Sequence, residues 1–295
     1  MMWLFLAFGI ALMTLGADWV VGGCGRLARH LRISPFIVSA LVIGVGGNIP
    51  EILITIMSAG GELESGIIPI IVSSNIINIL GIVGAVALFS PIVIRSASKR
   101  EVKIMLFSTV LISVMLYDGR LDFAEGLGLF AVFFYYMSGA KRSASRYEVV
   151  ARADWVRTIA LLAAGVGALY AGSEVFVKGV EAIMSQLSLA GSVIGSLIIA
   201  PATSGPEIIV SILALRRGRP QIMVGNMLGS CVSHIVLVAA IAGVLAEPAT
   251  ASFDYLWMLL ATIMFSIDIA WRKRIGRWNG IIYLLLLGLY FRTFF

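Results

Sequence analysis

The chain has 295 residues, of which 60% are hydrophobic and only 13% are charged, and its formal net charge is +6. A mean hydropathy of +1.00 leaves too little polar surface for a water-soluble protein of this length. Apolar stretches long enough to cross a bilayer as helices recur along the whole chain. They are continuous, whereas the strands of a membrane β-barrel would alternate over about ten residues. The composition therefore predicts an all-α integral membrane protein.

Ten apolar segments follow one another along the chain. They cover residues 2–24, 33–59, 66–91, 101–117, 122–140, 158–180, 190–215, 220–246, 254–271 and 278–295. The first resembles a secretory signal in length, but it lacks a basic start and continues past Asp18, so we interpret it as a transmembrane helix. Cys24 and Cys231 have no metal-ligand spacing and are expected to be buried.

The connections between these segments alternate in charge. Five of them carry 19 of the 22 Lys and Arg residues, and the others hold mainly Asp and Glu. By the positive-inside rule the five basic connections face the cytoplasm, and both termini are extracytoplasmic. The positive net charge is thus a topology signal, and no nucleic-acid partner is expected. Asp268, beside one basic connection, is expected to pair with Arg272 four residues on.

The second half of the chain repeats the first at an offset of 156 residues. This offset relates Asp18 to Glu174, Pro50 to Pro206, Glu51 to Glu207 and Ser74 to Ser230. Each half holds five segments, an odd number, so the second half enters the membrane upside down relative to the first. We expect two inverted five-helix repeats, residues 1–140 and 158–295, joined by a cytoplasmic linker at 141–157. Inverted repeats are typical of secondary transporters.

A Pro-Glu pair lies near the middle of the second segment of each half, at Pro50-Glu51 and Pro206-Glu207. Proline removes a backbone donor and frees carbonyl groups of the preceding turn. Such breaks are tolerated at membrane depth only where the backbone is buried in protein or lines a wet cavity. Carbonyl and carboxylate oxygens together suit a hard cation such as Ca²⁺. The pattern predicts broken helices at an ion site, with the two glutamates as ligands.

The third segment of each half adds a second polar strip. Ser74 and Asn78 lie four residues apart, as do Ser230 and His234, so each pair shares a helix face. Small polar residues also pack helices together in membranes. Beside the symmetric glutamates, ion ligation by Ser74, Asn78 and Ser230 is the favoured interpretation.

These motifs resemble those of the calcium/cation antiporter superfamily, which is typified by sodium/calcium exchangers. IAPATSGPEIIVSILALRRGRPQIMVGNMLGSCVSHI (199–235) looks like the second repeat motif, and GGNIPE (46–51) with SSNIIN (73–78) looks like the first. The motif regions span 44–78 and 200–234, and the ten segments extend the similarity over the whole chain. The resemblance implies exchange of Ca²⁺ against Na⁺ or H⁺ across one central cluster of sites, and we take Na⁺ as the expected coupling ion. The inverted repeat favours alternating access. No enzymatic activity and no cofactor are expected. The ligands that the resemblance implies are Glu51, Glu207, Ser74, Asn78, Thr203, Ser204, Ser230 and the carbonyls of Gly44 and Ala200.

This sequence departs from the superfamily pattern at several positions. Gly47-Asn48 replaces Thr-Ser before the first Pro-Glu and resembles the proton-coupled branch, Ile70 replaces an asparagine, and His234 replaces Asn or Asp. We include Asn48 and His234 in the candidate site. An imidazole suits borderline metals better than Ca²⁺, or it could couple transport to protons.

Several alternatives to sodium-coupled exchange therefore stay open. They are a proton-coupled exchanger of Ca²⁺ or another divalent cation, and a degenerate ion-binding member that does not transport. A channel would usually need several subunits around one pore. The sequence offers no Ser/His nucleophile, HExxH site or P-loop, so no enzyme is expected. The expected partners are inorganic cations and the lipid bilayer, in the plasma membrane, and no protein partner can be inferred. The roles of Asp18 and Glu174 are left open.

Overall fold

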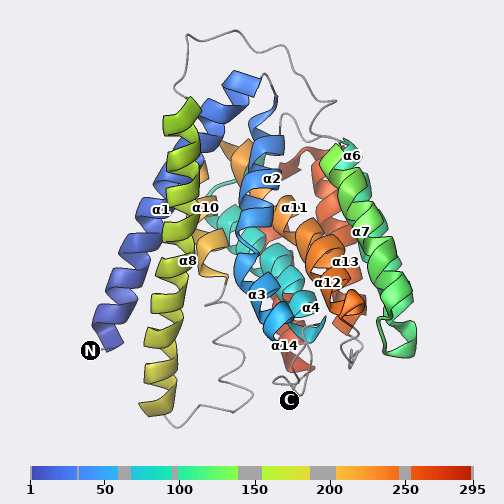
Figure 1. Cartoon of the computed structure of the whole chain (residues 1–295). Coiled ribbons are helices and arrows are strands. Elements are labelled where there is room, and N and C mark those ends of the chain that lie inside the picture. The colour runs from blue at the N-terminus through green and yellow to red at the C-terminus, as the bar shows by residue number, and fades with distance from the viewer. Residues whose placement is uncertain are drawn as a thin grey trace.

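The computed structural model describes residues 2–31, 33–58, 68–94, 99–138, 155–186, 204–245 and 254–293. Nearly all of them are helical (Figure 1). The first half contains α1 (Met2–Leu31), α2 (Pro35–Gly46), α3 (Ile49–Ser58), α4 (Ile68–Ile76), the π-helical segment η1 (Ile77–Val83), α5 (Gly84–Phe89), strand β1 (Ile92–Val93), α6 (Lys99–Met115), the 3₁₀ turn η2 (Leu116–Asp118) and α7 (Phe123–Ser138).

The second half has the same kinds of elements. It contains α8 (Trp155–Gln186), α10 (Gly205–Arg216), α11 (Pro220–Ser233), the π-helical segment η4 (His234–Val238), α12 (Ala239–Val244), α13 (Asp254–Ile267), the π-helical segment η5 (Asp268–Arg272), strand β2 (Arg274–Ile275) and α14 (Arg277–Arg292). Proline lies in the first turn of α2, α10 and α11, where its missing N–H breaks no helical hydrogen bond. Ser34 caps α2 by accepting a hydrogen bond from the Phe36 N–H at 3.3 Å.

Five continuous helical runs in the described part of the chain are long and apolar enough to cross a membrane. They are Met2–Leu31, Ile68–Phe89, Trp155–Gln186, Pro220–Val244 and Asp254–Arg272. The prediction of an all-helical membrane protein is thus confirmed at this level. α1 extends seven residues beyond the predicted end at residue 24. The predicted segment 33–59 is divided into α2 and α3 by a turn at Gly47 and Asn48.

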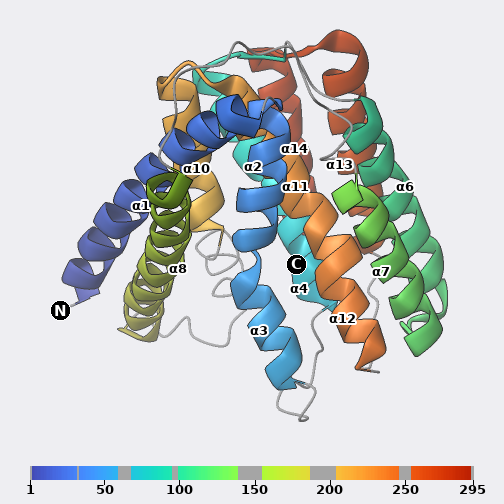
Figure 2. The same cartoon turned by 45° about the horizontal axis from the view of Figure 1, so that its top comes forward.

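The two longest helices, α1 and α8, lie side by side along one edge of the molecule (Figures 1 and 2). Glycines allow this close approach: a Cβ on Gly16 would lie 2.6 Å from the Gly165 carbonyl oxygen, and one on Gly172 would lie 2.7 Å from the Met13 nitrogen. Small residues at helix contacts are typical of membrane proteins, since van der Waals packing drives their association.

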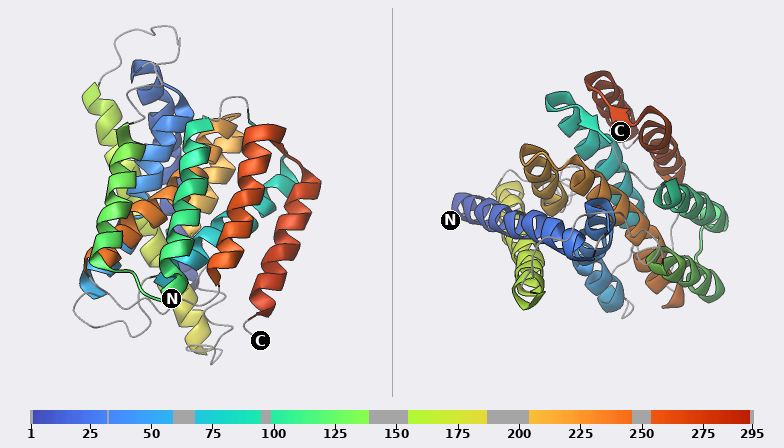
Figure 3. Two further views of the ribbon diagram at one scale, coloured as in Figure 1. Left: turned by 90° about the vertical axis from the view of Figure 1, so that its right-hand side faces the viewer. Right: turned by 90° about the horizontal axis from the view of Figure 1, so that it is seen from above.

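The buried centre is formed by α2 crossing α11, with α4, η1, η4 and α12 around them (Figure 2). A two-residue ribbon also joins the halves, because β1 pairs antiparallel with β2 through Ile92 and Ile275. In η5, which precedes β2, the Asp268 carboxylate accepts hydrogen bonds from Arg272 at 3.0 Å and Tyr283 at 2.8 Å. The predicted Asp268–Arg272 pair is confirmed. Figure 3 places both chain ends toward the same end of the molecule.

Candidate cation site

The turn between α2 and α3 presents polar groups of the first half to the buried centre. Gly47 ends α2 by donating to the Ile43 carbonyl at 2.6 Å, and Asn48 donates its side-chain amide to the Ser230 carbonyl at 3.2 Å. Asn48 is fully buried. Glu51 follows in the first turn of α3, where the positive end of the helix dipole favours a carboxylate.

Glu207 of the second half meets this turn from the other side. It lies in the first turn of α10 and is buried. A Cβ on Gly47 would lie only 3.3 Å from Glu207 Oε1, so the carboxylate rests against the turn backbone. Glu51 lies four residues after Gly47, in the first turn of α3, so both carboxylates lie close to the same turn. The structure therefore brings the two predicted glutamates into one region.

α11 supplies a third wall. A Cβ on Gly44 of α2 would lie 2.7 Å from the Ser230 nitrogen, so the two backbones touch where α2 crosses α11. Ser230 is fully buried, and Ser204, which precedes α10, is buried too. The sequence prediction that Gly44, Ser204 and Ser230 lie near the glutamates fits this arrangement. Ala200 and Thr203, the other predicted ligands of the second half, lie outside the described residues.

The π-helical segments mark the second polar strip in both halves. η1 begins at Ile77, just before Asn78, and η4 begins at His234. Residues 78 and 234 are 156 apart, so the two irregularities occupy equivalent positions in the repeat. π-Helical turns widen a helix by one residue and often occur at functional sites. Ser74 and Asn78 are both buried.

His234 is held by Asn75, a residue that the sequence analysis did not select. His234 Nδ1 lies 3.0 Å from Asn75 Oδ1, and the Asn75 amide donates to the Cys231 carbonyl at 3.4 Å. Because Asn75 Oδ1 can only accept, Nδ1 donates to it, and in the neutral imidazole Nε2 keeps its lone pair. The available signal was the repeat itself, since Asn75 and Cys231 are separated by 156 residues.

Several buried polar side-chain atoms in and around this region have no hydrogen-bond partner among the described residues. They are Asn48 Oδ1, Glu51 Oε2, Asn78 Oδ1, Ser211 Oγ, both carboxamide atoms of Asn226, Ser230 Oγ, Ser233 Oγ and His234 Nε2. Each such atom costs about 1–3 kcal/mol when it is left unpaired. Asn226, in the quoted GNMLGS motif, was also not selected. Oxygen dominates this set, and the described residues include no group of three His, Cys, Asp or Glu side chains suited to a metal ion. That composition suits hard cations better than zinc.

Asp18 lies apart from this cluster, on α1. It forms an ion pair with Arg217 from the turn between α10 and α11, and Arg219 of that turn donates to the Val21 carbonyl at 2.8 Å. Burial and the neighbouring cations Arg29, Arg217 and Arg26 lower the pKa of Arg219, although a guanidinium remains protonated. Glu174, the repeat equivalent of Asp18, is exposed on α8.

The profile of the sodium/calcium exchanger protein family matches residues 1–140 and 157–295. The chain belongs to this family. CaxA of Alkalimonas amylolytica is 31% identical over 96% of this chain and 95% of its own length. A sodium/calcium exchanger of Methanosarcina acetivorans is 25% identical over 95% of this chain and 94% of its own length. The solved sodium/calcium exchanger of Methanococcus jannaschii superposes with a TM-score of 0.87 at 26% identity, covering 99% of both chains.

Family membership confirms the resemblance found in the sequence. Members of this family are exchangers, which are transporters and not enzymes, and they handle inorganic cations in membranes. This chain is accordingly an integral membrane protein of the cation-antiporter type.

Proposed function

We propose that this chain is a secondary active antiporter that exchanges Ca²⁺ for Na⁺ by alternating access. The observation that supports it is the set of buried, unpaired polar atoms from both halves around the α2–α3 turn. Unpaired buried oxygens are retained at a cost, and a bound cation would satisfy them. Glu51 and Glu207 would balance the charge of one divalent ion or of two monovalent ions, and neutral oxygens would complete the shell.

The proposed ligands keep the set predicted from the sequence. They are the carboxylates of Glu51 and Glu207, the side chains of Asn48, Ser74, Asn78, Thr203, Ser204, Ser230 and His234, and the carbonyls of Gly44 and Ala200. Likeness to an exchanger whose crystals were soaked with Na⁺ and Sr²⁺ supports a site for both monovalent and divalent ions. Sr²⁺ is, like Ca²⁺, a hard divalent cation.

The proposed architecture is ten spans in two inverted repeats, residues 1–140 and 158–295, with helices broken at the ion site and the linker 141–157 between the repeats. The contact between the Asn75 amide and the Cys231 carbonyl supports it. Two residues related by a two-fold axis can touch only near that axis. The beginnings of α3 at Ile49 and α10 at Gly205, which are 156 residues apart, and the paired π-helical segments fit the same symmetry. Ions bound near the axis would be reachable from either side as the repeats exchange conformations.

The proposed orientation places the basic turns in the cytoplasm and both termini outside, in the plasma membrane. The C-terminal end of α1, the α10–α11 turn and the α13–α14 turn gather at one end of the molecule (Figure 2). All three carry Arg or Lys residues. This distribution follows the positive-inside rule.

One observation favours proton coupling, or a different divalent cation, as the second candidate. His234 Nε2 is a buried imidazole nitrogen without a partner in the described structure, at a position where the superfamily has Asn or Asp. An imidazole can take up a proton near neutral pH or bind a borderline metal ion. The third candidate, an ion-binding member that does not transport, would keep the same site but lack flux.

The test is ⁴⁵Ca²⁺ uptake into proteoliposomes, driven separately by a Na⁺ gradient and by a pH gradient. Wild type should respond to the Na⁺ gradient, and Glu51→Gln or Glu207→Gln should each abolish uptake, because half of the compensating charge is lost. The matched control is Glu174→Gln, which removes an exposed carboxylate from α8 and should leave uptake unchanged.

The outcomes separate the candidates. Uptake with the pH gradient alone would favour the proton-coupled exchanger. Saturable Ca²⁺ binding without uptake under either gradient would favour the non-transporting member. Wild-type uptake by Glu51→Gln or Glu207→Gln would refute the site.

A further inference from the structure

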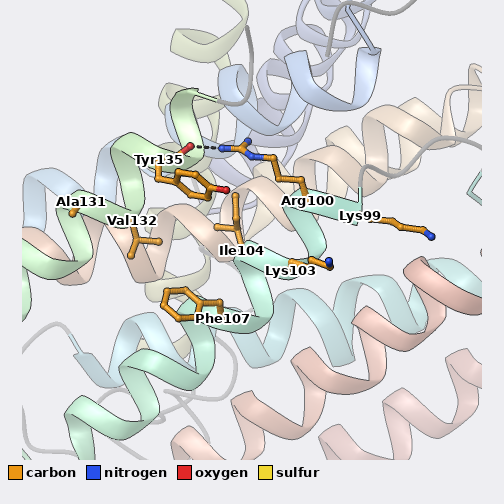
Figure 4. A pocket seen from close by; sticks show the side chains of 8 residues that line it. All are labelled: Lys99, Arg100, Lys103, Ile104, Phe107, Ala131, Val132 and Tyr135. Atoms are coloured by element: carbon orange, nitrogen blue, oxygen red, sulfur yellow. Dashed lines mark hydrogen bonds between the residues drawn. The ribbon is translucent and has the colours of Figure 1, made fainter. Parts of the chain in front are cut away.

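A groove on the outer surface of the helix bundle lies between α6 and α7, away from the candidate cation site. It has a volume of about 670 Å³ and is lined by Lys99, Arg100, Lys103, Ile104, Phe107, Ala131, Val132 and Tyr135. Figure 4 shows these side chains on the two facing helices. We propose that this groove binds one phospholipid with a negatively charged headgroup.

The lining changes from charged to apolar along the axis of α6. Lys99, Lys103 and Phe107 follow one another at intervals of four residues and so share one face. Eight residues of helix span about 12 Å, roughly the distance from a headgroup to the upper acyl chain. Val132 of α7, which faces the apolar part, adds to its wall. A soluble anion needs no such apolar extension, whereas a lipid does.

Arg100 is already engaged by the protein and closes one end of the groove. It donates to the Tyr135 carbonyl, to the Tyr136 carbonyl at 3.4 Å and to Ser138 Oγ at 3.5 Å. Its guanidinium carbon lies 4.6 Å from the centroid of the Tyr135 ring. It therefore satisfies the last carbonyls of α7 and joins the two helices.

The two lysines supply the charge for a ligand. The Oε1 atom of the buried Glu101 lies 3.5 Å from Arg100 Nη1, so this carboxylate balances the charge of the guanidinium. No hydrogen bond or ion pair engages Lys99 or Lys103 among the residues described, and both are exposed. In Figure 4 their amino groups end on the α6 side, away from Tyr135. Basic pockets between membrane helices bind anionic headgroups, and this one carries two exposed lysines, unpaired among the described residues, along the α6 edge of an apolar wall.

The experiment measures lipid retention by native mass spectrometry on the full chain, purified in detergent with equal amounts of phosphatidylglycerol and phosphatidylcholine. Wild type should retain one phosphatidylglycerol in preference to phosphatidylcholine. Lys99→Gln/Lys103→Gln should lower that retention roughly 30-fold, from the attraction of two cations near a membrane surface. The matched control is Arg274→Gln/Arg277→Gln, which removes two exposed cations from the α13–α14 turn and should retain the lipid.

A second variant tests the apolar wall without changing charge. Val132→Trp should fill the groove beside Phe107 and lower phosphatidylglycerol retention, while added glycerol 3-phosphate should not displace the lipid from wild type. Equal retention by wild type and the double lysine variant would overturn the proposal. Unchanged retention by Val132→Trp, or displacement by glycerol 3-phosphate, would also overturn it, because either result identifies a surface anion site. Transport is not part of this readout, so the result is independent of the proposed exchange activity.

Discussion

Replacing Gly229 by alanine should destabilise the protein at the crossing of α2 and α11. A Cβ there would lie 2.6 Å from Ala40 Cα and 2.8 Å from the Ala40 carbonyl carbon, and closer still to its oxygen. Carbon atoms pack at about 3.5–4.0 Å, so the helices would have to separate by roughly 1 Å. The atoms in the way belong to the backbone of a buried helix and cannot rotate aside.

The magnitude follows from two opposing effects. Over-packing costs about 1–3 kcal/mol, and a clash with rigid backbone belongs at the upper end of that range. Alanine regains up to about 1 kcal/mol of helix propensity over glycine. The net loss of stability should be about 2 kcal/mol, which lowers Tm by roughly 5 °C for a chain of this size.

The assay is thermal unfolding in detergent, followed by tryptophan fluorescence. The matched control is Gly288→Ala in α14, where no heavy atom lies within 4 Å of the added methyl group. That variant should be as stable as wild type or slightly more stable. Equal Tm values for Gly229→Ala and Gly288→Ala would refute the reasoning, because only the added methyl group at Gly229 meets neighbouring backbone atoms.

Three further predictions address other parts of the molecule. Asp268→Ala should lower the free energy of unfolding by about 3 kcal/mol, because it leaves the donors around this carboxylate unpaired. Asp118→Ala, at an exposed turn, should change the free energy of unfolding little, and similar losses for the two variants would contradict this. A cysteine at position 217 should react with a membrane-impermeant maleimide only after cells are permeabilised, since both native cysteines are buried; labelling in intact cells would reverse the orientation. His234→Asn should reduce Zn²⁺ and Co²⁺ uptake relative to Ca²⁺ uptake, because the imidazole nitrogen prefers borderline metals. Unchanged selectivity would exclude His234 from the ion shell.

The sequence was sufficient to predict that Glu51 and Glu207 come from equivalent positions of the two halves and lie in one region, because this follows from the repeat and from the cost of a buried carboxylate. A carboxylate after proline in an apolar segment is expensive, so finding it twice at equivalent positions predicted that Glu51 and Glu207 work together. The structure places them in one region, with Glu207 against Gly47. Neither the choice of these two glutamates nor their expected proximity required knowledge of side-chain packing.

The contacts of His234 could not be predicted in the same way. Helical spacing placed it on the face of Ser230, but a π-helical segment begins at residue 234 and changes the angular position of the residues that follow. Its partner Asn75 comes from the other half of the chain. Such a pair depends on how two helices are rotated about their axes, which the spacing of polar residues along one helix does not determine.

Differences between the two halves outside the ion site also bear on how an exchanger would work. Two identical inverted repeats would make the inward-open and outward-open states equal in energy. Here Asp18 on α1 pairs with Arg217, whereas residues 59–67, the repeat equivalent of the α10–α11 turn, contain two glutamates and no Lys or Arg to meet Glu174. An exposed ion pair contributes about 1 kcal/mol or less, or roughly a fivefold change in population. In the proposed alternating-access mechanism, charge on one side alone would therefore set the resting state without altering the proposed ion site.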